Sequence, residues 1–448
     1  MKVFIHAFGC QMNKLDAELA MGALRRAGGE PTENVEEADV ILYHTCSVRE
    51  HAEERVYSNV GKLKFLKRRR PEIVIGIMGC MAQKDRGAIF ERLPHVDLVV
   101  GTREFPRIAE LVEEARTTRK HLLACSEEAP VDEARDPAVR PNRTQAFLTI
   151  MRGCDNFCAY CIVPSVRGRE TSRPLGEVVA EARRLVDDGV VEITLLGQNV
   201  NSYGKSFGRP GVLVELLERL DRLNGLARIR FVTSHPKDMS REILQAVRDL
   251  PRVCEHLHMP AQSGSDRILK AMNRKYTAAH YRELVAMARE IVPGIAIASD
   301  FIVGFPGETE GEFDQTADLV RDLRFQNSFV FKYSPRPGTA AAKLSDDVLP
   351  EEKKRRNLEL LEIQLRVNRE EHAALVGREV EVLVEGVSAR DARRVTGRLR
   401  TNQIVVFPGG EELTGKLLRV RILSATPLTL VGEASAECGT NERPPATP

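Results

Sequence analysis

Three cysteines lie close together in one short segment of the chain. Cys154, Cys158 and Cys161 form a C-x3-C-x2-C motif. Thiolates at this spacing can hold a zinc ion or an iron–sulfur cluster. Structural zinc sites use four protein ligands, and no fourth Cys or His is near in the sequence. The spacing therefore favours an iron–sulfur cluster, with zinc as the alternative.

A cubane cluster takes one thiolate per iron, so three cysteines leave one iron open. An amine and a carboxylate can chelate such an iron, and the methionyl end of S-adenosylmethionine carries both. Reduction of the bound sulfonium then yields a 5′-deoxyadenosyl radical. We therefore expect this segment to be a radical-forming site.

Three other cysteines, Cys10, Cys46 and Cys80, are far apart in sequence but share a position. Each follows a predicted strand, and these strands are Val3–Ala7, Val40–Tyr43 and Ile73–Ile77. The carboxyl ends of parallel strands meet at one edge of a sheet, so the three thiols can converge on a second site. The alternative is three unrelated buried thiols, which are common. We interpret the remaining Cys125, Cys254 and Cys438 as structural or incidental.

The elements that must position these cysteines fall into an N-terminal and a central region. In residues 1–124, strands alternate with helices, which predicts a doubly wound parallel sheet and an α/β fold. The predicted helices here are Lys14–Arg26, Ser47–Leu66, Arg86–Arg92 and Ile108–Arg116, and a fourth strand is Val96–Val100. Residues 125–143 are polar and carry prolines, so we interpret them as a linker.

Residues 144–375 contain six strand–helix units, which predicts a partial (βα)6 barrel. The expected strands are Ala146–Met151, Glu192–Leu196, Ile229–Val232, His256–Met259, Ala296–Val303 and Phe329–Tyr333. The first cysteine motif follows the first of these strands. Gln198 and Asn199 follow the second, at the mouth where barrel sites lie, and can bind the methionyl carboxylate or amine or simply form a turn. Gln262 and Ser263 follow the fourth strand and suit a ribose contact.

The C-terminal region changes from a helical to an alternating pattern. After the charged helix Pro350–Leu375, residues 376–434 form short alternating strands, which predict a small β-barrel. Five arginines cluster there, which suits phosphate binding, and they are Arg390, Arg393, Arg394, Arg398 and Arg400. The basic run Lys62–Arg70 is interpreted as a solvated helix end. Residues 435–448 have the composition of a loose tail.

Composition limits the classes of protein that the chain can be. Its 448 residues are 42% hydrophobic and 29% charged, which excludes disorder as the main state. No run of 18 apolar residues occurs, so no spanning helix is expected. Nine cysteines, an odd number, argue against full disulfide pairing. We expect a cytoplasmic protein that does not bind a membrane, and no nucleophile–base pair is evident for a catalytic assignment.

The sequence resembles the radical S-adenosylmethionine methylthiotransferases over nearly its whole length, with an N-terminal methylthiotransferase domain, a radical core and a TRAM-type barrel. Within them it looks most like the tRNA 2-methylthio-N6-dimethylallyladenosine synthases. Three segments carry the resemblance, and they are Cys154–Arg169, Leu195–Gly204 and Phe331–Thr339. Sister families that act on a ribosomal protein or on threonylcarbamoyl-adenosine carry different residues at Gly197–Asn201.

This resemblance implies two [4Fe–4S] clusters, the second an auxiliary cluster held by Cys10, Cys46 and Cys80. It also implies S-adenosylmethionine contacts beyond those at Gln198, Asn199, Gln262 and Ser263. The segment Ile302, Val303 and Gly304 resembles the adenine-contacting segment of radical enzymes, and backbone near Tyr333 and Ser334 is a further contact carried over from the family.

The implied reaction adds a methylthio group to carbon 2 of N6-isopentenyladenosine beside the tRNA anticodon. One S-adenosylmethionine donates the methyl group and a second is the radical source. The implied partners are the tRNA anticodon stem-loop, a reducing electron donor and a sulfur source of unknown identity, and we expect a monomer. The alternatives are one of the sister methylthiotransferases, or a non-catalytic iron–sulfur protein that binds RNA or senses redox state.

Overall fold

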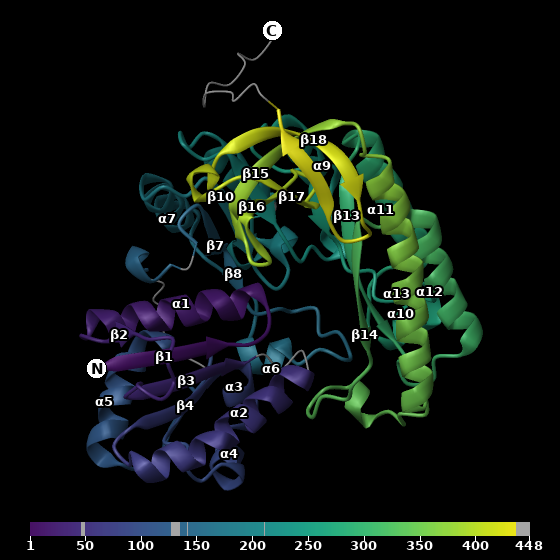
Figure 1. The fold of residues 1–448 in the computed structure, drawn as a ribbon. Coiled ribbons are helices and arrows are strands. Elements are labelled where there is room, and N and C mark those ends of the chain that lie inside the picture. The colour runs from purple at the N-terminus through teal and green to yellow at the C-terminus, as the bar shows by residue number, and fades with distance from the viewer. Residues whose placement is uncertain (46–49, 127–134, 141, 210, 436–448) are drawn as a thin grey trace.

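The computed structural model describes residues 1–45, 50–126, 135–140, 142–209 and 211–435. Cys46 and Cys438 therefore lie outside the described residues, as does the predicted start of the second helix at Ser47. Three structural units follow one another along the chain, with the C-terminal unit seated over the central one (Figure 1). Within the described part of the chain, no helix combines the length and apolar character needed to cross a membrane.

The N-terminal unit is a six-stranded sheet in which every pairing is parallel. Its strand order is β2 (Glu30–Pro31), β1 (Lys2–Ala7), β3 (Val40–Thr45), β4 (Val74–Gly79), β5 (Leu98–Val100) and β6 (Leu122–Ala124). The predicted doubly wound sheet is therefore confirmed. The two edge strands β2 and β6 were not expected, because two or three residues show no alternation or apolar run that distinguishes them from a loop.

Helices cover both faces of this sheet. On one face lie α1 (Gln11–Arg26) and α5 (Ile108–Thr118), and on the other lie α2 (Glu50–Arg69) and α4 (Ala88–Arg92). The helix predicted at 86–92 is preceded by a separate helix, α3 (Cys80–Asp85). The two are separated because Arg86 takes a left-handed conformation with φ of 47°.

The central unit contains six parallel strands in two three-stranded groups. These strands are β7 (Gln145–Thr149), β10 (Glu192–Leu196), β11 (Arg228–Phe231), β12 (His256–His258), β13 (Ala296–Val303) and β14 (Asn327–Lys332). The groups are β11-β10-β7 and β12-β13-β14. Backbone hydrogen bonds join them, among them one from Ser234 to His258 and one from Cys254 to Ile229, each 2.9 Å long. The predicted partial (βα)6 barrel is confirmed.

The helices of the central unit alternate with its strands. They are α7 (Leu175–Asp187), α8 (Val212–Asp221), α9 (Arg241–Asp249), α10 (Asp266–Ala271), α11 (Ala278–Ile291), α12 (Glu310–Leu323) and α13 (Pro350–Ala373). Ser265 caps α10 by accepting a hydrogen bond from the amide of Ile268. A short ribbon of β8 (Met151–Arg152) and β9 (Thr171–Ser172) encloses the small helix α6 (Val163–Arg167).

The C-terminal unit is a closed five-stranded barrel, which confirms the predicted small β-barrel. Its order is β15 (Glu379–Ser388), β16 (Asp391–Arg398), β17 (Ile404–Pro408), β19 (Leu430–Ala434) and β18 (Leu417–Ala425). Alternate residues such as Val382, Val395 and Phe407 fill its interior. The alternation seen in the sequence thus separates the core from the surface of this unit.

One of the five clustered arginines, Arg400, attaches this barrel to the central unit. Arg400 contacts both carboxylate oxygens of Glu255, at 2.7 and 2.8 Å, and the carbonyl oxygen of Val253 at 2.6 Å. Arg398 binds Glu385 within the barrel at 2.8 Å. Arg398 and Arg400 thus already have carboxylate partners, and Arg393 and Arg394 lie 3.2 and 3.6 Å from Asp391. The expectation that the five arginines form a phosphate-binding face stays a prediction. Arg390, Arg393 and Arg394 remain exposed.

Candidate functional site

The loop that joins β8 to α6 carries Cys154, Cys158 and Cys161. Gly153 begins it with φ of +74°, and an added Cβ there would lie 2.1 Å from the carbonyl oxygen of Arg169. Only glycine fits this close approach without a shift of the backbone. Phe157 holds φ of 47° without being a glycine, which is a strained conformation of the kind that clusters at functional sites.

The thiols of this loop lie in a partly buried environment that suits binding of a cationic cluster core. Burial and the neighbouring cysteines raise the pKa of Cys161 to about 12, and burial raises the pKa of Cys154. A bound metal deprotonates such thiols. Nη1 of Arg274 lies 3.2 Å from Sγ of Cys158 and offers a charged donor to a thiolate. The donor set therefore fits an iron–sulfur cluster.

Within the described ranges, no three His, Cys, Asp or Glu side chains are already arranged around one metal position. Assignment of Cys154, Cys158 and Cys161 as cluster ligands consequently depends on their shared loop and on their chemistry. Arg274 had no signal in the sequence, because it reaches Cys158 from the loop after α10.

The second set of cysteines comes from neighbouring strands of the N-terminal sheet. Cys10 precedes α1 and follows the loop after β1, while Cys80 begins α3 directly after β4. The order β2-β1-β3-β4 reverses direction between β1 and β3, and such a switch point is where doubly wound sheets bind ligands. Gly79 has φ of +100°, and an added Cβ would lie 2.6 Å from Cε1 of His44. Cys10 and Cys80 are near enough to interact electrostatically.

The helix α6 brings the two sets of cysteines together. It begins two residues after Cys161, and Ile162 and Val166 pack against the buried Cys80. Thr102 of the N-terminal unit donates a hydrogen bond of 2.7 Å to the carbonyl oxygen of Val166. The radical-type cysteine loop and the N-terminal sheet edge therefore share one interface.

A buried ionic cluster lies at the same interface, and the sequence did not predict it. Nη2 of Arg167 contacts Oδ2 of Asp16 at 2.7 Å, and Arg152 and His44 lie 3.5 and 3.7 Å from the same carboxylate. Burial opposes ionisation of Asp16, but Arg167, His44 and Arg152 outweigh it and hold the pKa of Asp16 well below its usual value. These residues are isolated charges in the sequence, so only their three-dimensional neighbours identify them.

The two amides predicted after β10 differ in their availability. Oε1 of Gln198 is buried without a hydrogen-bond partner. Asn199 already uses both ends of its amide, since it donates to Asp238 at 2.7 Å and accepts from the backbone of His235 at 3.1 Å. Gln198 therefore has an unused acceptor for a ligand, whereas Asn199 holds neighbouring loops together.

Gln262 and Ser263 lie in a buried turn beside β13. Gln262 has φ of 70° and pairs through its backbone with both Asp300 and Ile302. The hydroxyl of Ser263 accepts a hydrogen bond from the amide of Ser265 at 3.1 Å and lies 3.3 Å from the hydroxyl of Thr316. Ser263 thus braces the start of α10, and its role toward a ribose stays a prediction.

The segment predicted to contact adenine presents its side chains in opposite directions. Ile302 joins Ala159, Tyr160, Phe305 and Tyr333 in an apolar cluster beside the cysteine loop. Val303 packs instead into the main core, so only its backbone is available on the site's side.

Gly304 and Tyr333 are held close to the same cluster. Gly304 is constrained because an added Cβ would lie 2.3 Å from Cγ of Lys353. The hydroxyl of Tyr333 is buried without a partner, and its amide donates to the carbonyl oxygen of Val303 at 2.9 Å. Ser334 follows in a half-buried position.

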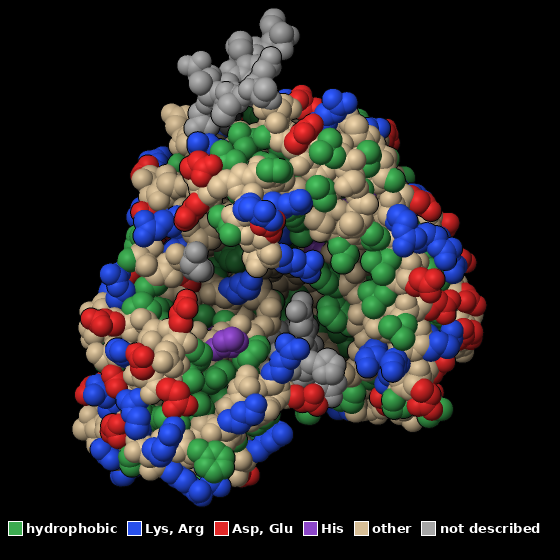
Figure 2. Space-filling view, in the orientation of Figure 1, with side chains coloured by type: hydrophobic (Ala, Val, Ile, Leu, Met, Phe, Trp, Pro, Cys, Tyr) green, Lys and Arg blue, Asp and Glu red, His purple; other side chains and the backbone are tan. Residues whose placement is uncertain are grey.

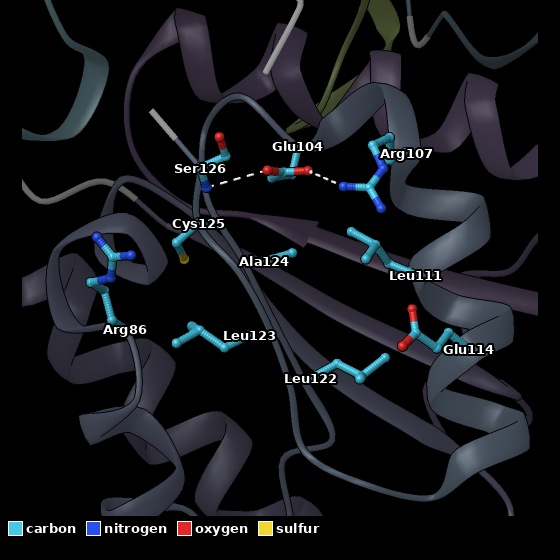
Figure 3. A pocket seen from close by; sticks show the side chains of 10 residues that line it. All are labelled: Arg86, Glu104, Arg107, Leu111, Glu114, Leu122, Leu123, Ala124, Cys125 and Ser126. Atoms are coloured by element: carbon cyan, nitrogen blue, oxygen red, sulfur yellow. Dashed lines mark hydrogen bonds and ion pairs between the residues drawn. The ribbon is translucent and has the colours of Figure 1, made fainter. Parts of the chain in front are cut away.

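A pocket of about 440 Å³ lies elsewhere, between the edge strand β6 and α5 (Figure 3). Leu122, Leu123 and Cys125 line it together with Glu104, which forms an ion pair with Arg107 at 3.1 Å. Of the cysteines predicted as cluster ligands, the five that the structure describes are absent from its lining. Cys125 is buried there, consistent with the expected structural role.

Three family profiles match successive parts of the chain. They are the radical SAM superfamily over residues 148–320, the uncharacterized protein family UPF0004 over residues 2–101, and the TRAM domain over residues 373–434. Among solved structures, the radical S-adenosylmethionine methyltransferase TsrM from Kitasatospora setae, with cobalamin and a [4Fe-4S] cluster bound, is 15% identical with a TM-score of 0.55. It covers 76% of this chain and 77% of its own. The chain thus has the fold of the radical S-adenosylmethionine enzymes.

Curated relatives show which family within this class of enzymes the chain belongs to. A tRNA-2-methylthio-N(6)-dimethylallyladenosine synthase from Moorella thermoacetica is 48% identical, over 96% of this chain and 97% of the relative. Proteins with the same name from Rhodopirellula baltica and Carboxydothermus hydrogenoformans are 45% and 44% identical, each over 96% of this chain, and 95% and 98% of their own lengths are covered. The chain belongs to the tRNA-2-methylthio-N(6)-dimethylallyladenosine synthase family, whose radical chemistry uses [4Fe–4S] clusters and S-adenosylmethionine.

Proposed function

We propose that this enzyme adds a methylthio group to carbon 2 of N6-isopentenyladenosine beside the anticodon of tRNA. Two S-adenosylmethionine molecules are consumed, one as methyl donor and one as radical source. The observation that carries the proposal is the contact of Cys80 with Ile162 and Val166, which sets an N-terminal cysteine beside the radical-type loop. A reaction that must transfer sulfur to a carbon radical needs its two sites to be adjacent.

Six cysteines are proposed as cluster ligands. Cys154, Cys158 and Cys161 hold the cluster whose open iron binds S-adenosylmethionine, and Cys10, Cys46 and Cys80 hold the auxiliary cluster. A cluster held by Cys154, Cys158 and Cys161 would, when reduced, supply the electron needed for reductive cleavage of S-adenosylmethionine. Arg274 supports this site by donating to Cys158.

The surrounding residues are proposed to orient S-adenosylmethionine and to exclude water. The unpartnered Oε1 of Gln198 suits the methionyl ammonium, which can donate to it. Ile302 and Tyr333 present an apolar surface beside the cysteine loop that suits the adenine. We assign Gln262 to the ribose. The other predicted residues are proposed to shape the site through their backbone or by holding neighbouring loops in place, and they are Asn199, Ser263, Val303, Gly304 and Ser334.

The exposed arginines of the C-terminal barrel are proposed to contact the tRNA. Arg390, Arg393 and Arg394 lie on the β15–β16 hairpin and its turn, and Arg393 is 91% exposed. Figure 2 shows Lys and Arg side chains gathered over this hairpin and around the hollow beneath it. Cations along such a hollow attract a phosphate backbone, and an unstacked loop base can then reach the interior. We further propose that the enzyme works as a cytoplasmic monomer with an external electron donor and sulfur source.

The direct test incubates reconstituted enzyme, dithionite, S-adenosylmethionine and sulfide with tRNA that carries N6-isopentenyladenosine. Mass spectrometry of the nucleoside digest should show the gain of a methylthio group. Matched reactions with threonylcarbamoyl-adenosine tRNA and with ribosomal protein test the sister activities and should give no product. RNA binding without formation of 5′-deoxyadenosine would instead indicate a non-catalytic protein. Iron analysis should give about eight irons per chain, as expected from two cubane clusters.

A further inference from the structure

Arg167 is buried at the interface between the two sets of cysteines. It ends α6, the helix that begins two residues after Cys161, and its side chain is only 5% exposed. The N-terminal unit holds this helix in place, since Thr102 donates to the carbonyl oxygen of Val166 at 2.7 Å. The position of the guanidinium is therefore fixed from both sides of the interface.

Arg167 has protein partners for only part of its guanidinium. Nη2 contacts Oδ2 of Asp16 at 2.7 Å and Oδ1 of Asn13 at 3.3 Å. Nη1 is buried without a hydrogen-bond partner. A buried, charged donor without an acceptor is costly, so an acceptor is expected at this position.

The ionisable groups around Arg167 identify the chemistry of that acceptor. Besides Asp16, the groups whose charge Arg167 feels are the thiols of Cys80 and Cys10. Cys80 packs against Val166, one residue before Arg167. The surroundings of Nη1 thus favour an anionic sulfur.

We propose that Nη1 of Arg167 donates a hydrogen bond to a sulfur atom of the auxiliary cluster itself, and that this contact raises the reduction potential of the cluster. The inference rests on the proposed function, in which Cys10, Cys46 and Cys80 hold that cluster. Three thiolates around a doubly positive core leave the cluster with a net negative charge, which a buried guanidinium stabilises most in the reduced state. Arg167 belongs to the radical core, so one unit of the protein tunes a cluster that another unit holds.

The test uses the full-length chain with Cys154, Cys158 and Cys161 all changed to Ala, so that only the auxiliary cluster can form. Arg167→Met, Arg167→Lys and the double variant Asp16→Asn/Arg167→Met are made in this background. The double variant removes the carboxylate that Arg167→Met would leave unpaired. The control is Arg135→Met, because Arg135 is also a buried arginine between the units, bound to Glu18 at 3.2 Å and Glu181 at 2.5 Å, and none of its recorded partners is a cysteine.

The readouts are the iron content, the thermal unfolding midpoint and the cluster's reduction potential from a titration followed by electron paramagnetic resonance. The potential should become more negative in Arg167→Met, with Arg167→Lys between Arg167→Met and the background protein. The double variant should shift less than Arg167→Met, because loss of the Asp16 charge acts in the opposite direction. Arg135→Met should change the unfolding midpoint and leave the potential unaltered.

Several results would overturn the inference. An Arg167→Met variant that loads its cluster and keeps the background potential would reduce Arg167 to a structural partner of Asp16. A difference that emerges only after free sulfide is added would place the donor on an exogenous sulfur. Background protein without iron would reject the auxiliary ligand set, and with it this inference, whereas a loaded cluster with unaltered potential in every variant would reject the inference alone.

Discussion

The two sets of cysteines reach the same interface by different routes. Cys154, Cys158 and Cys161 share one loop, so the local backbone sets how far apart they are. Cys10 and Cys80 belong to loops after β1 and β4, so their separation is set by the pairing of β1 with β3 and of β3 with β4. The first set is therefore local in origin, and the second depends on the fold of a whole sheet.

Because of this difference, the two sites are expected to respond differently to mutation. A local site responds to changes within its own loop, and the rest of the protein can stay intact. A site built from strand ends shares its stability with the sheet, but its ligands can be removed singly without disturbing the radical loop. The interface through α6 is a place where the two sites depend on each other.

The largest expected effect comes from Cys158→Ala. Loss of one of three thiolates should prevent the radical-type cluster from forming, because the loop carries no fourth cysteine that could replace it. Formation of 5′-deoxyadenosine should fall to the level of the reductant blank, and methylthio product should vanish. Cys254→Ala removes a buried thiol elsewhere in the same unit and should keep both activities.

Cys80→Ala should separate the two sites. Iron should fall by about half, since one of two four-iron clusters is lost. Reductive cleavage of S-adenosylmethionine should continue, measured as 5′-deoxyadenosine by chromatography, while the methylthio product disappears. If cleavage stopped as well, the division of labour between the two sets of cysteines would be wrong.

Gly153→Ala tests the local character of the radical loop. The left-handed backbone costs a non-glycine residue about 1–2 kcal/mol, and the new Cβ must also move away from the carbonyl oxygen of Arg169. We expect a marked loss of iron from the radical-type site alone, seen as a fall in 5′-deoxyadenosine with the auxiliary cluster still present. Gly176→Ala, in α7 with open space around it, is the matched control and should behave as the parent protein.

The smallest effect on the clusters should come from Arg400→Ala. Loss of its contacts to Glu255 and Val253 should lower the free energy of unfolding by about 1–3 kcal/mol, measured by denaturant titration. The KM for tRNA should rise, while formation of 5′-deoxyadenosine stays unaltered because the contacts of Arg400 are made to Glu255, Pro251 and Val253.

Arg393→Ala is the counterpart on the exposed face of the same barrel. This variant should have a free energy of unfolding within about 0.5 kcal/mol of the parent protein, because the side chain of Arg393 is 91% exposed. The slope of log K for tRNA binding against log salt concentration should decrease in magnitude by about one, as expected for the loss of one phosphate contact. Equal stability losses in Arg393→Ala and Arg400→Ala would contradict their assignment to different roles.

Much of the fold was predictable because its signals are local. Strict alternation in Glu379–Glu385 and six apolar strands with intervening helices report burial directly through side-chain periodicity. The strands β10 and β13 were placed at the same residues that the structure gives them. The short strands β2 and β6 escaped detection, because their pairing partners rather than their own residues make them strands.

By itself, the sequence determined the class of chemistry, since the spacing of Cys154, Cys158 and Cys161 is a property of one continuous loop. It also placed Cys10 and Cys80 after strands, from which a shared sheet edge followed. Only the tertiary structure decided that α6 seats Cys80 beside the radical loop, that Arg167 and Asp16 are buried there as a pair, and that Arg400 serves the barrel interface. Charged residues carry no periodic signal of their partners, because a long side chain can be solvated, paired or buried with the same neighbours in sequence.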